Sequence, residues 1–194
     1  RVPRHRFIPE SDVYVAYEQQ SGHAMAVYGK NGDEDGYYRI WDGSSWSLTE
    51  GTIHAPGDAG GKLRWTTLAS DPNSDRIALG AITEGKDTWL AVWDGSGWEP
   101  SELATQSSPH SDRLNVAVAF QSTTGEALAT YATDADQVRY RTWTSGVGWS
   151  GEESGPDLGG RPEGMTLDAD PASDAVMLSV LDQDALTMGP QVSA

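Results

Sequence analysis

Cysteine is absent from the 194-residue sequence, which excludes disulfides, thiolate metal sites and cysteine nucleophiles. Long apolar runs are also missing: no stretch approaches the roughly 20 apolar residues that span a bilayer, so we expect no membrane insertion. Basic residues are few, because 13 Lys and Arg stand against 29 Asp and Glu, giving a formal net charge of −16. Such an acidic surface repels phosphate backbones and anionic lipid, so nucleic acid is not an expected partner.

The N-terminal residues differ in charge from the rest of this acidic chain. Arg1, Arg4 and Arg6 form a basic arm, which either docks on the acidic body or a neighbouring subunit, or remains a solvated terminus. The sequence begins without Met and without an apolar signal segment, and we expect it to derive from a longer precursor. Because lysine is scarce and Gly, Ser, Thr and Asp are frequent, we expect an extracellular or cell-surface location.

Tryptophan, in contrast, is abundant, and it occurs in a repeated motif. The segment "IWDGSSW" at 40–46 returns as "VWDGSGW" at 92–98 and, loosened, as "TWTSGVGW" at 142–149. The second tryptophans of the three copies are 52 and 51 residues apart. A further series with steps of 52, 51 and 48 residues marks a short apolar strand in each unit: Met25, Ile77, Leu128 and Val176. Two series with similar steps predict a repeat architecture.

Each unit is predicted to contain only strands. Short β-branched and aromatic runs alternate with turn clusters such as "DPNSD" at 71–75, and no helical periodicity is sustained over ten residues. Four antiparallel strands in about 50 residues are typical of one β-propeller blade. We therefore predict an all-β fold, a single β-propeller domain over 1–194. Its units are 12–62, 63–113, 114–163 and a shortened 164–194.

The shortened last unit needs completion, because an open ring leaves two unpaired edges. We predict that residues 1–11 supply a closing strand to this unit, which gives a four-bladed propeller within one chain. The alternative is closure between chains, as a ring or a filament.

Arginine accompanies tryptophan in two of the units. Alternate residues of a strand share a face, so Arg39 lies beside Trp41 and Arg141 beside Trp143, whereas the second unit has Ala91 at this position. Such a pair recognises sugars, because the indole stacks on a pyranose and the guanidinium donates to hydroxyls. Alternatively, the same side chains pack between blades. The candidate carbohydrate-binding residues are Arg39, Trp41, Trp46, Arg141, Trp143 and Trp149.

These repeats resemble the WDG-x-x-W repeats of secreted bacterial β-propeller proteins. More distantly, they are similar to the blades of fungal fucose-binding lectins, in which this turn follows a strand with a sugar-contacting arginine. The resemblance implies that Arg39 with Trp46, and Arg141 with Trp149, contact sugar. The third unit lacks the Asp and carries an inserted residue, and the fourth lacks the motif. Units one and three are therefore expected to bind, and the second is not.

The segment "NGDEDG" at 31–36 resembles the first half of a calcium loop, with oxygen ligands on alternate residues before a glycine. The candidate ligands are Asn31, Asp33, Asp35 and Asp42. The alternative is a solvated acidic hairpin, and apart from calcium no cofactor is expected. The four histidines show no metal-ligand spacing, and no G-x-S-x-G motif occurs, so we predict no catalytic residue and no enzyme.

Two functions follow from these patterns. The first is a non-catalytic, extracellular or surface propeller that binds carbohydrate in the manner of a lectin. The alternative is a structural subunit of an extracellular filament or sheath, assembled by strand exchange through its termini. A propeller that serves as a protein-docking platform is a third, less specific hypothesis. The expected partners are therefore glycans or other copies of the chain in a homo-oligomer.

Overall fold

The computed structural model of the protein describes residues 13–182 and 186–188, which contain strands and turns but no helix. Within these ranges, accordingly, no helix is long and apolar enough to cross a membrane. The strands form four antiparallel sheets, here called blades 1 to 4, in chain order. An all-β fold is thus confirmed.

The blades contain the following strands. Blade 1 consists of β1 (Val13–Tyr17), β2 (Ala24–Gly29), β3 (Gly36–Trp41) and β4 (Gly51–Ile53). Blade 2 consists of β5 (Leu63–Ser70), β6 (Ile77–Thr83), β7 (Thr88–Trp93) and β8 (Glu102–Thr105). Blade 3 consists of β9 (Val116–Phe120), β10 (Ala127–Tyr131) and β11 (Gln137–Thr144), with β12 (Gly148–Trp149) and β13 (Glu153–Asp157) both paired to β11. Blade 4 consists of β14 (Pro162–Ala169), β15 (Val176–Asp182) and β16 (Leu186–Met188).

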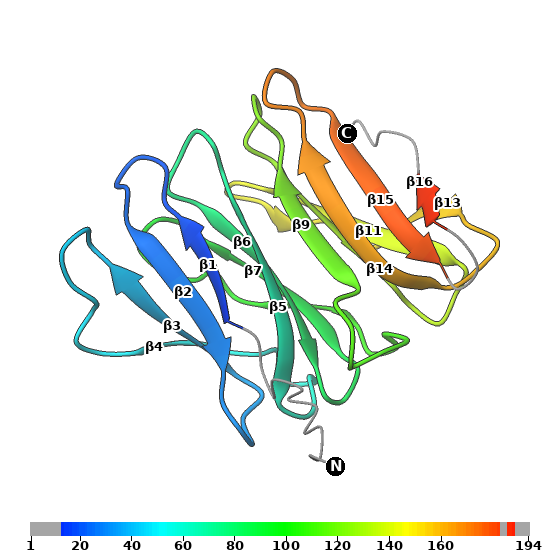
Figure 1. The fold of residues 1–194 in the computed structure, drawn as a ribbon, viewed down its shortest axis with the longest axis horizontal. Helices are drawn as coiled ribbons and strands as arrows, with labels where there is room; N and C mark the ends of the chain where they lie inside the picture. The colour runs from blue at the N-terminus through cyan, green and yellow to red at the C-terminus, as the bar shows by residue number, and fades with distance from the viewer. Residues whose placement is uncertain (1–12, 183–185, 189–194) are drawn as a thin grey trace, which may run out of the picture.

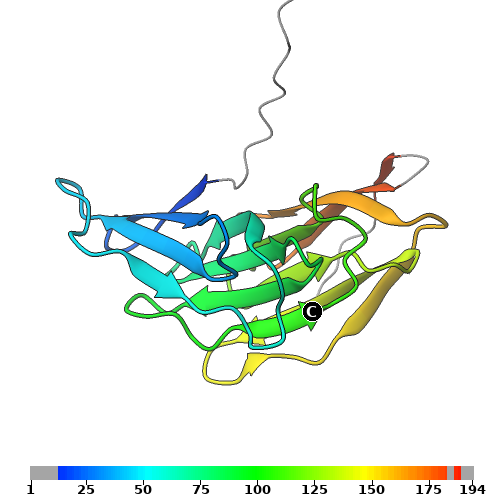
Figure 2. The ribbon, with the colours of Figure 1, turned by 90° about the horizontal axis from the view of Figure 1, so that it is seen from below.

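The blades stack face to face in sequence order, with their first strands β1, β5, β9 and β14 side by side. Figures 1 and 2 show the result, an open arc with blade 1 at one end and blade 4 at the other. No strand of blade 1 pairs with a strand of blade 4 among the described residues. The predicted closed four-bladed ring is therefore not confirmed, and the predicted closing segment 1–11 lies outside the described residues.

The apolar core consists of layers between neighbouring blades. Met25 and Val27 of blade 1 pack in one cluster with Leu79 and Trp89 of blade 2. Equivalent clusters lie between blades 2 and 3 and between blades 3 and 4. Because blade 2 is covered on both faces, every residue of β6 and β7 is buried, and these strands are continuous apolar runs.

Ladder partners correct one alignment made from the sequence. Ala24, Ile77 and Ala127 each lie opposite the first tryptophan of their motif, so these three residues are equivalent. Met25 and Leu128 are one residue further on and face the next blade. The series from Met25 to Val176 therefore mixes the two faces of the sheets, because a shift of one residue turns a strand's side chains over.

The turns after the first strand of each blade fasten neighbouring blades together. Asp75 of blade 2 accepts hydrogen bonds from the backbone N–H groups of Gln20 and Ser21 in blade 1, at 2.7 and 2.9 Å to Oδ1. Asp174 of blade 4 accepts the corresponding bonds from Thr123 and Thr124 in blade 3, at 2.8 and 3.0 Å. The same carboxylate clamp thus joins blade 1 to blade 2 and blade 3 to blade 4.

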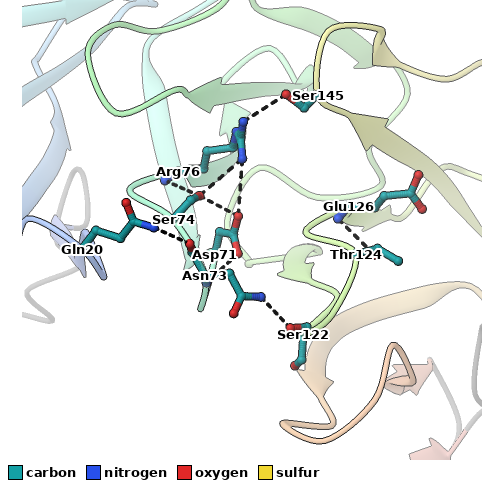
Figure 3. Close-up of polar contacts among 9 residues, drawn as sticks. All are labelled: Gln20, Asp71, Asn73, Ser74, Arg76, Ser122, Thr124, Glu126 and Ser145. Atoms are coloured by element: carbon teal, nitrogen blue, oxygen red, sulfur yellow. Dashed lines mark hydrogen bonds and ion pairs between the residues drawn. The ribbon is translucent and has the colours of Figure 1, made fainter.

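The joint between blades 2 and 3 is made differently, as Figure 3 shows. Here Asn73 Nδ2 donates to the carbonyl of Ser122 at 2.6 Å, and Arg76 Nη2 donates to Ser145 Oγ at 3.0 Å. Blade 3 has Gly125 at the position of Asp75, with a positive φ of 70°. The turns therefore alternate along the arc with a period of two blades.

Candidate functional site

The repeated motif is a tight hairpin that places its two tryptophans opposite each other. Trp41 pairs with Trp46, and Trp93 with Trp98, with ring centroids 5.7 and 5.8 Å apart. In blade 3 the paired residues are Trp143 and Trp149. Offset and edge-on aromatic pairs at this separation stabilise a hairpin beyond their buried area.

The Asp-Gly pair of the motif forms the turn itself. Asp42 Oδ1 accepts the backbone N–H groups of Ser44 and Ser45, each at 2.8 Å, and these bonds hold the pKa of Asp42 below its usual value. For Asp94, burial acts to raise the pKa, but the N–H groups of the turn, the Ser96 hydroxyl and the charge of Arg76 together outweigh it, and the pKa is lowered. Gly43 has a φ of 93°, which an L side chain rarely adopts. The Asp and Gly are therefore structural.

The first tryptophan of each motif anchors its blade to the one before. Trp93 and Trp143 are 4% and 0% exposed. Their indole N–H groups donate to carboxylates of the preceding blade, Trp93 to Glu18 at 2.6 Å and Trp143 to Glu99 at 2.9 Å. Trp143 therefore packs between blades rather than reaching solvent. Trp41 is partly exposed, because among the described residues no blade precedes it.

The two arginines predicted to contact sugar have a common structural role. Arg39 Nη1 donates to the carbonyl of Ser47 at 2.8 Å, and Arg141 Nη1 donates to that of Ser150 at 3.0 Å. Each arginine thereby holds the residue that follows its second tryptophan. Arg141 also donates to Glu102 Oε1 of blade 2 at 3.2 Å. The guanidinium of Arg141 therefore lies at the joint between blades 2 and 3.

The second tryptophans line clefts between blades. A cleft of about 400 Å³ lies between blades 1 and 2, where Tyr38, Thr52 and His54 face Trp98 and the residues after it. A cleft of about 390 Å³ lies between blades 2 and 3, where Glu99, Pro100 and Glu102 face the 146–149 turn with Trp149. Among the residues that the structure describes, only those of blade 1 lie beside Trp46, which is 46% exposed.

The cleft between blades 2 and 3 is the more acidic of the two. It combines one aromatic face with two carboxylates, and Arg141, which is not among the residues that line the cleft, is bonded to one of these carboxylates. The indole of Trp143 fixes Glu99 from behind through Oε2. Analysis of the sequence missed Glu99 and Glu102. The available signal was the segment "WEPSE" at 98–102, which follows the motif of one blade and faces the motif of the next.

The structure does not bring the four candidate calcium ligands together. Asp42 lies at one end of β3, while Asn31, Asp33 and Asp35 lie at the other. Asp35 accepts from the Ala55 backbone N–H at 2.8 Å, and Asn31 accepts from Lys62 at 3.2 Å. In the part of the chain that the structure describes, no group of three or more acidic or histidine side chains is placed to hold a metal ion.

Sheets stacked about a common axis, with clefts between them, define a β-propeller, and solved propellers share this arrangement. The NanB sialidase from Streptococcus pneumoniae superposes with a TM-score of 0.58 at 10% identity, over 93% of this chain and 30% of that one. The SapL1 lectin, solved in complex with alpha methyl fucoside, gives 0.54 at 16% identity, over 96% and 66%. The six-bladed Aleuria aurantia lectin, for which a fucose recognition mode is described, gives 0.53 at 11% identity, over 88% and 56%.

This likeness shows the fold, and the chain spans less than two thirds of the length of each of these proteins. The expected similarity to fungal fucose-binding lectins holds at the level of the fold. No protein-family model matches the chain, and no curated protein sequence matches it.

Proposed function

We propose that this protein is a non-catalytic, lectin-like propeller that binds carbohydrate in the cleft between blades 2 and 3. The observation that carries the proposal is the composition of that cleft: Trp149 on one wall, and Glu99 and Glu102 on the other. An indole stacks on the apolar face of a pyranose, while carboxylates accept hydrogen bonds from its hydroxyls. The Arg141 guanidinium donates to Glu102 and so orients this carboxylate on its wall of the cleft.

The other two tryptophan sites are weaker candidates for physical reasons. The cleft at Trp98 has no arginine, because Ala91 occupies that position and is buried. At Trp46 the arginine is present, but the described residues supply only one wall. One binding site per chain is therefore expected. Similar folds that bind fucosides make methyl α-L-fucoside the first probe, and an extracellular location remains part of this proposal.

Glycan-array screening followed by calorimetry tests the proposal. Glu102→Gln and Trp149→Ala are each expected to weaken binding at least about tenfold, because each removes a principal contact. Glu84→Gln is the matched control, since Glu84 also pairs with an arginine, Arg64 of its own blade, and is as exposed as Glu102, at 49% against 47%. Binding to no glycan, or equal binding by all variants, would contradict the proposal.

A further inference from the structure

The end of the arc formed by blade 1 exposes side chains of a kind that the same fold buries elsewhere. Val13, Val15 and Tyr17 of β1 are 64%, 55% and 56% exposed. They share a face of blade 1 with Trp41, because Tyr17 lies opposite Ala24, which lies opposite Trp41. We call this the leading face of blade 1. A solvated strand of an isolated sheet would carry polar side chains there.

The leading face of blade 1 matches, position by position, the face of blade 3 that blade 2 covers. On the first strands, Val13, Val15 and Tyr17 correspond to Val116, Val118 and Phe120. On the second strands, Ala24, Ala26 and Tyr28 correspond to Ala127, Ala129 and Tyr131. On the third, Arg39 and Trp41 correspond to Arg141 and Trp143. In blade 3, Val116, Val118 and Phe120 are at most 6% exposed.

The other end of the arc presents the counterpart of blade 2. Met177 and Leu181 of blade 4 are 44% and 52% exposed. Their ladder positions are those of Ala78 and Ile82, which belong to the cluster between blades 2 and 3. Leu181 and Ile82 are thus equivalent in position, and both are large aliphatic residues. We call this the trailing face of blade 4.

Blades 2 and 4 are also alike in their turns. Both carry the sequence Asp-Pro-x-Ser-Asp, at 71–75 and 170–174. In both, the last Asp clamps the backbone of the preceding blade, whereas blades 1 and 3 have Gly22 and Gly125 at this position. Blades with this Asp therefore alternate with blades that have Gly. Within the chain, blade 2 with its Asp is followed by blade 3 with its Gly. The same order would place a blade like blade 1 after blade 4.

We propose that the leading face of blade 1 is an interface for a second copy of this chain, whose blade 4 covers it with its trailing face. The contact is head-to-tail, because it joins two different surfaces. It repeats the apolar layer of the joint between blades 2 and 3 across two chains, without the bonds of Asn73 and Arg76, because blade 4 has Ala172 and Ala175 at those positions.

The oligomeric state, measured by analytical ultracentrifugation across a range of concentrations without any glycan, tests the interface. The unmodified chain is expected to sediment as species heavier than a monomer. Val15→Asp blocks the leading face and Leu181→Asp the trailing face, so each variant alone is expected to be monomeric. Mixed in equal amounts, the two variants retain one intact face each and are expected to form a dimer that grows no further.

Val147→Asp is the control, since Val147 is 83% exposed and lies in the 146–149 turn of blade 3, outside both faces, and it is expected to assemble as the unmodified chain does. Tyr17→Lys provides a second variant of the leading face, should Val15→Asp disturb folding as judged by circular dichroism. A chain that is monomeric at every concentration overturns the proposal. A mixture of the two variants that stays monomeric while the unmodified chain assembles overturns it as well. Because no glycan is involved, failure here is distinguishable from failure of the proposed binding function.

Discussion

At the scale of single residues, the two tryptophans of each motif have different roles. In blades 2 and 3, the first tryptophan is an anchor, which donates its indole N–H to a carboxylate of the preceding blade. The second tryptophan of these two blades lines an inter-blade cleft. Sequence position alone does not separate these roles, because both tryptophans flank the same turn. The difference arises from the blade that packs in front, and it leads to a test on equivalent residues.

Trp143→Ala is expected to reduce the free energy of unfolding by about 3–5 kcal/mol, because it removes a fully buried indole and leaves a cavity. With both substitutions made in the monomeric Leu181→Asp background, the equivalent Trp41→Ala is expected to cost less than half as much, since Trp41 has no covering blade in the described residues of one chain. Urea denaturation followed by circular dichroism measures both values. Equal losses would show that the two indoles are equally buried.

The Tyr37–Asp33 pair gives stability a pH dependence at both extremes. The Tyr37 hydroxyl donates to Asp33, which lowers the pKa of Asp33 and raises the pKa of Tyr37 to about 12. The stabilisation by Asp33 is complete above its unfolded pKa of about 4 and is lost as pH falls. The stabilisation by Tyr37 is complete below its unfolded pKa of about 10 and is lost as pH rises through its folded pKa of about 12.

Tyr37→Phe is therefore expected to reduce stability most between about pH 4 and pH 10, where the hydrogen bond is fully formed in the unmodified protein. Below about pH 4 and above about pH 10, the stability of the variant is expected to change less steeply with pH than that of the unmodified protein. Thermal unfolding from pH 2 to 12 provides the measurement. A profile that keeps its slope at both ends in the variant would show that this hydrogen bond does not form in solution.

At the scale of strands and blades, close approach of neighbouring sheets fixes the joints. A Cβ added at Gly80 of β6 would lie 2.7 Å from Val116 Cγ2 of blade 3. Gly80 does not have a left-handed backbone conformation, so conformation does not explain the glycine. The glycine is needed here because blade 3 approaches too closely for a Cβ atom. Blade 4 has Ser179 at the equivalent ladder position, so the proposed contact on its trailing face requires a slightly wider spacing than the joint between blades 2 and 3.

Gly80→Ala is expected to destabilise the protein by about 1–3 kcal/mol through overpacking between blades 2 and 3. Gly97→Ala serves as the control, because a Cβ there meets no atom within 4 Å, and it is expected to change stability by less than about 0.5 kcal/mol. Denaturant midpoints of the two variants give the comparison. If the two midpoints coincide, the joint is looser than the structure describes.

At the scale of the whole molecule, local patterns predicted the blades but not their arrangement. The strands, the tight turns and the tryptophan pairs depend on residues close in sequence, and the motif spacing was sufficient to place them. The open arc depends on which blade faces are covered, and the repeated motif does not reveal this. Val15 and Val118 are equivalent residues, yet one is 55% and the other 6% exposed.

The candidate site shows the same division between local and distant information. Arg141 and Trp149 belong to one motif and were identified from it. Glu102 lies 39 residues before Arg141 and meets it only because blade 2 packs on blade 3. The calcium hypothesis was limited similarly, because the sequence spacing did not reveal that β3 separates Asp42 from the acidic hairpin.

The central claim, carbohydrate binding between blades 2 and 3, is tested most directly by a crystal structure of the protein with the glycan that it binds best. The account predicts electron density for one sugar ring stacked on Trp149, with hydroxyls within hydrogen-bond distance of Glu99 or Glu102. A glycan bound elsewhere on the molecule, with this cleft filled only by water, would contradict it.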